Sequence, residues 1–267
     1  MNVPPSDPAP RFVQTPEGPV ALVEEGDGTA LVCVHGVPGS HRDFRHLAPR
    51  VTPFARMVRV DLPGMGQTPA PEGYDGSLEA RAAAVRGAVD ALGIERFALL
   101  GHSMGGAVAV AAADAMPARV THLVLVASVG PRRHRGMQGM YPWMLDAAAL
   151  ALTVPGLRER LVPSLRERWR RARFPGTERM SAADLRLQLR LAARMDFAAH
   201  ARRLARVRVP TLVAWAEDDH LVEPAVSAAL AAAVPGATRL VFDEGGHNLQ
   251  KTRATEIAAA VRELLGR

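Results

Sequence analysis

Short, mostly apolar runs recur along the chain and alternate with longer alanine-rich stretches. Runs of this length and composition are typical of strands that are buried on both faces of a parallel sheet. The pattern predicts strands at Ala30–Val34, Met57–Val60, Phe97–Leu100, His122–Val126, Thr211–Trp215 and Thr238–Phe242.

The alanine-rich stretches have the spacing and the end signals of helices. Helices are predicted at Ser77–Leu92, Met104–Met116, Pro224–Val234 and Thr252–Leu265. Ser77 suits an N-cap and Pro224 a first helical position. Because strands and helices alternate, we expect a doubly wound α/β fold with a mostly parallel sheet. The segment Phe12–Glu24, interrupted at 16–18, predicts an antiparallel hairpin at the sheet edge.

Between residues 131 and 206 the alternation stops. This stretch is helical in composition, rich in arginine and interrupted by prolines, and it contains no convincing strand. We therefore expect a core formed by residues 1–130 and 207–267, with 131–206 inserted as an all-helical cap.

Composition and charge exclude several classes of protein. The 267-residue chain has one cysteine, Cys33, so no intramolecular disulfide is possible. Its first ten residues do not resemble a signal peptide, and its longest apolar run, around 147–157, is too short to span a bilayer. A cytoplasmic protein is expected, with a small molecule as its partner.

The net charge of +6 raises the question of nucleic acid binding. Only Lys251 is a lysine, so 32 of the 33 basic residues are arginines, which together with the abundant alanine indicates a compositional bias. No nucleic-acid-binding motif accompanies the charge, and we expect no nucleic acid partner.

The strongest chemical signal is Gly101-His102-Ser103-Met104-Gly105-Gly106, which lies between a predicted strand and a predicted helix. A nucleophilic serine on a sharp strand-to-helix turn needs small neighbours, and the following helix directs backbone N–H groups toward developing negative charge. The position and composition of this turn predict that Ser103 is a nucleophile.

A nucleophilic serine requires a base and an acid that orients the base. Of nine histidines, His247 follows the last predicted strand and precedes the last helix, so it should lie at the same sheet edge as Ser103. Three consecutive carboxylates, at 217–219, follow the preceding strand, and the pattern alone does not choose among them.

Five motifs, in this order, resemble those of the α/β-hydrolase superfamily, in the group with a helical cap. They are His35-Gly36-Val37-Pro38-Gly39-Ser40, Asp61-Leu62-Pro63-Gly64-Met65-Gly66, the turn at 101–106, Glu217-Asp218-Asp219, and Gly246-His247. The resemblance implies a Ser103–His247–acid triad that needs no cofactor or metal. It favours Asp219 over Asp218 as the acid, and it implies that the backbone N–H groups of Val37 and Met104 form an oxyanion hole.

The resemblance also limits the chemistry. Dehalogenases and epoxide hydrolases of this group carry an aspartate where Ser103 stands. Carbon–carbon bond hydrolases of ring-cleavage diketo acids share the serine turn, but they usually carry a tryptophan after the histidine, where Asn248 stands here.

Two features of the cap allow more than one interpretation. The apolar stretch Met137–Leu145 suggests that Met140, Trp143 and Met144 line a substrate pocket, or that they only pack the cap onto the core. The cluster Arg168–Arg173 is more typical of a solvated helix face than of an anion site.

The expected function is hydrolysis of a small, largely apolar ester or lactone through an acyl-enzyme. The alternatives are a carbon–carbon bond hydrolase and a receptor-like protein that binds a ligand on a hydrolase fold.

Overall fold

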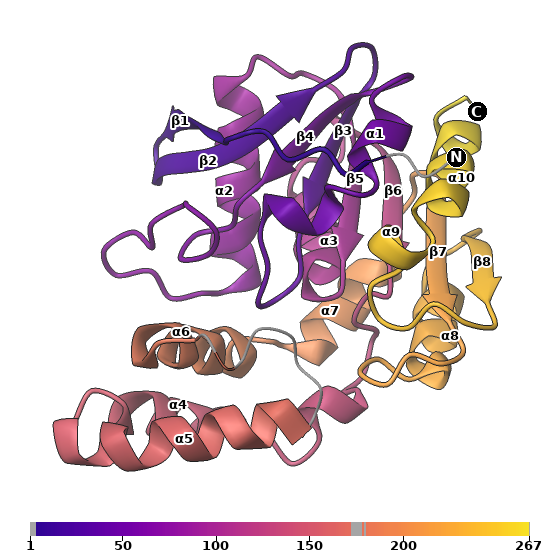
Figure 1. Ribbon diagram of the computed structural model, residues 1–267. Coiled ribbons are helices and arrows are strands. Elements are labelled where there is room, and N and C mark those ends of the chain that lie inside the picture. The colour runs from indigo at the N-terminus through magenta and orange to yellow at the C-terminus, as the bar shows by residue number, and fades with distance from the viewer. Residues whose placement is uncertain (1–3, 172–177, 179, 267) are drawn as a thin grey trace.

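An eight-stranded sheet forms the centre of the computed structural model, which describes residues 4–171, 178 and 180–266 (Figure 1). The strand order is β1-β2-β4-β3-β5-β6-β7-β8. β1 and β2 form an antiparallel hairpin, β2 pairs antiparallel with β4, and all the other pairs are parallel. The strands are β1 (Arg11–Thr15), β2 (Gly18–Glu25), β3 (Ala30–Val34), β4 (Arg56–Val60), β5 (Phe97–His102), β6 (Val120–Val126), β7 (Thr211–Ala216) and β8 (Thr238–Phe242).

Alternate side chains of the central strands point to opposite faces of the sheet, where two hydrophobic clusters form. In β3, Val32 and Val34 belong to one cluster, while Leu31 and Cys33 belong to the other. The first face is covered by α2 (Leu78–Ala91), α3 (Met104–Ala115), α7 (Phe197–Leu204) and α8 (Pro224–Ala233). The second is covered by η1 (His41–Phe44), α1 (Ala48–Val51), α9 (Leu249–Thr252) and α10 (Ala254–Leu265). The doubly wound arrangement expected from the alternating pattern is confirmed.

Two of the predicted strands, β4 and β8, contain polar or charged residues, and the reason differs between them. Arg59 in β4 is fully buried and forms an ion pair with Glu25 on the neighbouring strand β2. β8 was expected to be buried on both faces, and this is wrong, because β8 is the last strand of the sheet and has no neighbour on its outer side. Thr238 and Arg239 are exposed there, and Val241 is 45% exposed.

The described residues between β6 and β7 form helices and no strand. These are η2 (Arg135–Met137), α4 (Pro142–Ala151), α5 (Pro155–Arg171), α6 (Ala182–Ala193) and α7. Helices α4, α5 and α6 share a separate hydrophobic cluster and form a layer apart from the sheet, with α6 next to the core (Figure 1). Helix α7 instead buries Leu204 in the hydrophobic cluster on the first face of the sheet.

Helix α6 rests on the loop that follows β4. A Cβ atom on Gly64 would lie 2.5 Å from the Leu187 side chain, and one on Gly76 would lie 2.7 Å from that of Leu191. The Arg190 guanidinium donates to the Tyr74 carbonyl at 3.1 Å. These contacts fix the side of α6 that faces the carboxyl ends of the strands. No helix within the described residues is long and apolar enough to span a membrane.

Candidate active site

Ser103 stands on the tight turn between β5 and α3. Its backbone has φ 54° and ψ −124°, a conformation that residues other than glycine rarely adopt. The turn also lies against β3, since a Cβ on Gly105 would be 2.2 Å from the Val34 carbonyl oxygen. Glycine at position 105 is therefore required for the turn to pack against β3.

The three side chains predicted to form the triad lie in hydrogen-bonding contact. His247 Nε2 is 2.9 Å from Ser103 Oγ, and His247 Nδ1 is 2.8 Å from Asp219 Oδ2. Asp219 comes from the loop after β7, and His247 from the loop between β8 and α9. All three follow parallel strands, whose carboxyl ends meet at one edge of the sheet.

Asp219 has the surroundings of an ionised carboxylate. Its side chain is fully buried, and Oδ1 accepts from the backbone N–H groups of Leu221 (2.8 Å) and Val222 (3.1 Å). Burial alone would raise its pKa, but the hydrogen bond and charge of His247 and the two N–H groups hold the pKa below its ordinary value. A charged Asp219 that accepts from the imidazole fixes the orientation of the ring.

Asp218 makes different contacts. Its Oδ1 accepts from the N–H groups of Gly245 (3.0 Å) and Gly246 (2.7 Å), directly before His247. Of the three carboxylates that the pattern left open, Asp219 contacts the imidazole, Asp218 holds the turn that carries it, and Glu217 accepts from Trp215 Nε1 at 3.0 Å.

His102 is a neighbour of the site whose contact the sequence did not suggest. Its Nε2 donates to the His247 carbonyl at 2.9 Å, although the two residues are far apart in the chain. Burial, together with the nearby His247, lowers the pKa of His102 to about 3. A neutral His102 therefore anchors the backbone of the His247 loop.

The loop after β3 brings Val37 to the same place. Val37, Ser103 and Met104 line one cavity. Met104 is the first residue of α3, so its N–H has no acceptor within the helix. Both predicted oxyanion-hole residues therefore lie beside Ser103.

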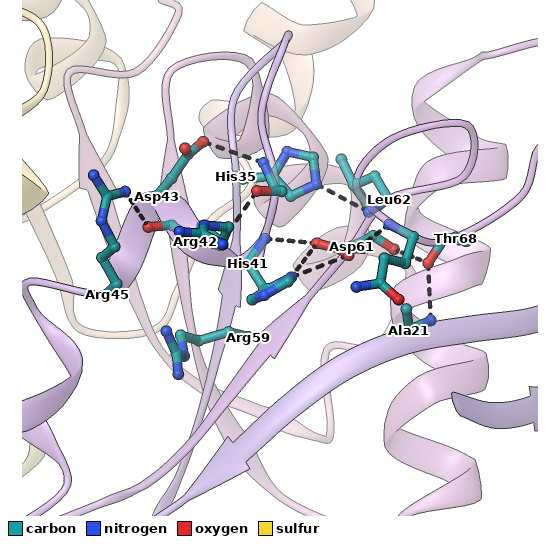
Figure 2. A network of polar contacts seen from close by, with 12 residues as sticks. Ala21, His35, His41, Arg42, Asp43, Arg45, Arg59, Asp61, Leu62 and Thr68 are labelled. Atoms are coloured by element: carbon teal, nitrogen blue, oxygen red, sulfur yellow. Dashed lines mark hydrogen bonds and ion pairs between the residues drawn. The ribbon is translucent and has the colours of Figure 1, made fainter. Parts of the chain in front are cut away.

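A buried polar network holds the Val37 loop in place (Figure 2). The carboxylate of Asp61 accepts from the His41 backbone N–H (2.6 Å), from His41 Nδ1 (3.0 Å) and from the Gln67 N–H (2.9 Å). His35 Nε2 accepts from the Leu62 N–H at 3.0 Å. Burial would raise the pKa of Asp61, but the hydrogen bonds from His41 and Gln67 lower it. The loops after β3 and β4 are thus joined through a carboxylate, which explains why both motifs accompany the serine turn.

Two cavities adjoin Ser103. The first lies between the core and helices α5 and α6 and is largely apolar; its lining residues are Val37, Pro38, Ser103, Met104, Val129, His134, Met137, Met140, Trp169, Gln188 and Ala192. The second is polar and lies toward α9; its lining residues are Gly36, Val37, Pro38, Asp43, Arg45, His102, Ser103, Leu221, His247, Asn248, Gln250 and Lys251. Because both cavities include Ser103, the two sides of this residue have different surroundings.

The structure places one of the three predicted pocket residues in the apolar cavity. Met140 lines it, whereas Trp143 is 70% exposed, Met144 is 42% exposed, and neither lines this cavity. Helix α4 turns Leu145 inward, and a helix advances about 100° per residue, so Trp143 points to the opposite face. The expectation that Trp143 and Met144 contribute to this pocket is therefore wrong.

Sequence reasoning missed Trp169, His134 and Gln188 as lining residues of the apolar cavity. A signal for Gln188 was present, because it is an uncharged polar residue next to Leu189 on the apolar face of α6. Trp169 was hidden in the arginine cluster of α5. There Arg170 and Arg171 pair with Glu167 on the exposed surface, while Arg173 lies outside the described residues.

No group of three or more histidine, cysteine, aspartate or glutamate side chains within the described part of the chain could hold a metal ion.

Comparison with known proteins agrees with this architecture. Residues 31–260 match the model of the alpha/beta hydrolase family. A 2-hydroxy-6-oxononadienedioate/2-hydroxy-6-oxononatrienedioate hydrolase of Cupriavidus pinatubonensis is 29% identical over 274 residues, which cover 96% of this chain and 95% of that protein.

Two solved structures share the fold. The esterase EaEST of Exiguobacterium antarcticum superposes with a TM-score of 0.75 at 20% identity, covering 96% of this chain and 99% of that one. A meta-cleavage product hydrolase of Pseudomonas fluorescens IP01 superposes with a TM-score of 0.71 at 20% identity, covering 97% and 98%. With the family model matched over most of its length, the chain belongs to the alpha/beta hydrolase family and is a hydrolase.

Proposed function

We propose that the protein hydrolyses a small carboxylic ester or lactone through an acyl-enzyme, with Ser103, His247 and Asp219 as its triad. The observation that carries the proposal is the continuous contact from Ser103 Oγ through the imidazole to the Asp219 carboxylate, at 2.9 and 2.8 Å. An isolated serine hydroxyl is a weak nucleophile, and this arrangement gives it a base that a charged acid orients.

In the first half-reaction, Ser103 Oγ attacks the carbonyl carbon and His247 Nε2 accepts its proton. The ester C–O bond then breaks, and His247 returns the proton to the leaving alcohol. Water attacks the acyl-enzyme in the second half-reaction, with the imidazole again acting as base and then as acid.

The negative charge of each tetrahedral intermediate would be stabilised by the N–H groups of Val37 and Met104. Such donors stabilise the oxyanion more than the ground-state carbonyl, and losing one typically costs ~100–1,000-fold in rate. Their place beside Ser103, at the start of α3 and in the loop tied to Asp61, supports this role.

The helical segment within residues 131–206 would act as the cap that selects the substrate. The apolar lining contributed by Met137, Met140 and Trp169 favours a substrate with an apolar part.

Labelling with a fluorophosphonate tests the proposal directly. The reagent should modify the wild-type protein at Ser103 and should not modify Ser103→Ala. Substitution of Ser128, a buried serine close to the same turn, by alanine provides the control and should leave labelling intact. Failure of the wild-type protein to react with the reagent would exclude the proposed mechanism. It would also exclude a receptor-like protein whose triad is still reactive.

A second candidate is hydrolysis of a ring-cleavage diketo acid. It is favoured by the relative from Cupriavidus pinatubonensis, whose name specifies a dienedioate. Against it, no described side chain that lines the apolar cavity is a lysine or arginine, although Arg45 and Lys251 line the polar one. Turnover of a 2-hydroxy-6-oxo-dienoate, followed by its absorbance beside that of simple esters, would decide between the two.

A further inference from the structure

Exposed apolar side chains are concentrated in α4 and at the start of α5. Of the eight large hydrophobic residues that are exposed in the described part of the chain, six lie within residues 141–157. These six form what we call the outer patch: Tyr141, Trp143, Met144, Leu150, Val154 and Leu157. The other two, Phe12 and Val241, lie singly on the two edge strands of the sheet. Single exposed side chains are normal, whereas a concentration of them marks an interaction surface.

Helix α4 is apolar on its outer face as well as on its inner face. Leu145 and Ala149 pack into the cluster that α4 shares with α5 and α6. A helix advances about 100° per residue, so Trp143, Ala147 and Leu150 lie on the opposite face, where all three are exposed. A surface helix ordinarily carries polar residues on that face. Because α4 and α5 lie on the far side of α6 from the sheet (Figure 1), the outer patch faces away from the core.

The charge beside α4 is positive. Asp146 is the only charged residue of the helix, and it forms an ion pair with Arg194 at 2.9 Å. The Arg133 guanidinium lies 5.7 Å from the centre of the Tyr141 ring, directly beside the outer patch. Arg133 is exposed and has no ion-pair partner among the described residues.

Helix α5 extends the outer patch with a basic stripe. Arg160 and Arg168 lie within about 60° of Leu157 around the helix axis. Both arginines are exposed, and neither forms an ion pair with a described residue. Glu159 lies about 200° from Leu157 and therefore on the other side of the helix. The outer patch thus combines apolar side chains with free positive charge.

This combination favours one kind of partner. In a two-fold pair of identical chains the outer patch would face itself, so basic residues would meet basic residues. A lipid surface with anionic headgroups offers negative charge and an apolar interior together. Tryptophan is enriched at such interfaces, and arginine is attracted to their charge.

We propose that the outer patch docks the protein onto a lipid surface with anionic headgroups. Trp143 and Leu150 enter the apolar part of the interface, while Arg160 and Arg168 approach the headgroups. Docking does not depend on the reaction at Ser103. It does bear on which substrates reach the site, since Met140, directly before the outer patch in the chain, lines the apolar cavity.

Cosedimentation of the full-length protein with lipid vesicles tests the proposal. Vesicles of equal parts phosphatidylcholine and phosphatidylglycerol should bind the protein about tenfold more tightly than vesicles of phosphatidylcholine alone, and added salt should weaken this binding. Replacing both Trp143 and Leu150 by serine should lower the partition coefficient on the mixed vesicles by about tenfold or more. Replacing both Arg160 and Arg168 by glutamine should lower it by about tenfold on the mixed vesicles only.

Matched controls and a second readout come from residues elsewhere in the chain. Phe12→Ser removes an exposed apolar side chain from β1, and Arg239→Gln removes an exposed arginine from β8; both variants should bind like the wild type. Of the three tryptophans, Trp169 and Trp215 are buried, so a shift of the emission to shorter wavelength on the mixed vesicles reports on Trp143. Trp143→Phe should bind without this shift.

The proposal is overturned if the wild-type protein binds neither kind of vesicle, or binds both equally well. Equal losses in the outer-patch variants and in the controls would also overturn it, provided that circular dichroism shows each variant to be folded. A dimer in light scattering that dissociates when Trp143 and Leu150 are replaced by serine would assign the outer patch to a second copy of the chain instead.

Discussion

At the scale of single residues, the site separates tasks that the sequence presents as alternatives. Asp218 and Asp219 are adjacent, yet one accepts from the turn at Gly245 and Gly246 and the other accepts from the imidazole of His247. Their side chains diverge because the chain turns sharply after β7, where the Asp219 N–H donates to the Ala216 carbonyl. Neighbouring carboxylates thus hold the backbone and the side chain of the same loop.

We expect Asp219→Asn to lower kcat by about 10,000-fold, because a neutral amide stabilises the wrong imidazole tautomer and does not stabilise the imidazolium. Asp218→Asn should cost far less, since an amide oxygen still accepts from the two glycine N–H groups. Steady-state kinetics on one ester would measure both effects. Equal losses in the two variants would contradict this division of roles.

Gln188→Leu should maintain or raise stability. Removing a buried amide whose Oε1 lacks a described partner removes a desolvation cost of about 1–3 kcal/mol, while leucine fills a similar volume. The Tm of the variant should equal or exceed that of the wild type in a thermal melt. A clear fall in Tm would mean that the amide has a stabilising partner.

Sequence reasoning predicted that Ser103, His247 and Asp219 would come together, because each occupies a short motif next to a strand, and the three side chains are in contact. It did not find the link from His102 to the His247 carbonyl, because that contact joins segments that only the folded sheet brings together. It also misplaced Trp143 and Met144, since an apolar residue on a cap helix serves equally well on its inner or outer face, and composition does not distinguish them.

At the scale of elements, the close approach of α3 to β3 makes the serine turn intolerant of change. Gly105→Ala would place a Cβ 2.2 Å from the carbonyl oxygen of Val34, a backbone atom in the middle of the sheet. We expect a loss of more than about 3 kcal/mol in the free energy of unfolding, typical of severe overpacking. Urea denaturation would measure it.

Gly156→Ala is the control for that experiment. Gly156 lies near the start of α5, and a Cβ there would meet nothing within 4 Å. Alanine has the higher helix propensity, so the variant should be as stable as the wild type or slightly more stable. A comparable loss in both variants would contradict the close-packing explanation.

The strands were predictable because their apolar runs are short, separated by turn residues and interrupted by few charges. Arg59 is the exception in β4, and its burial depends on Glu25 from a strand that pairs with it only in the folded sheet. The final helix was predicted to begin at Thr252, whereas α10 begins at Ala254 and is preceded by the short helix α9, which was not predicted. Neither feature has a local signal.

At the scale of the whole molecule, several buried histidines link stability to pH. Burial lowers the pKa of His200 to about 4 and that of His102 to about 3, against about 6.5 in an unfolded chain. Below about pH 6.5 the unfolded state therefore binds protons that the folded state does not. The free energy of unfolding should fall as the pH falls from 6.5 toward 4.

His200→Gln should reduce this pH dependence. His200 is fully buried on α7, and its Nε2 atom is 3.3 Å from the Val129 carbonyl. Each such histidine contributes about 1.4 kcal/mol per pH unit in this window, so the slope should decrease by about that amount. Urea denaturation at a series of pH values would measure it. An unchanged slope would show that His200 does not titrate differently in the two states.

The chain's order has a consequence for how such a protein diversifies. Ser103, Asp219 and His247 all lie outside the segment between β6 and β7, and so do the residues that hold them. The segment that contains α4, α5 and α6 can therefore be replaced as one continuous stretch of sequence, while the turn that carries Ser103 stays the same. A replacement would have to keep the contacts of α6 with the core, which include those at Gly64, Gly76 and Tyr74 and the hydrogen bond from Arg81 of α2 to the Leu191 carbonyl. A change of substrate specificity would then need changes in the helices between β6 and β7, without changes at Ser103, Asp219 or His247.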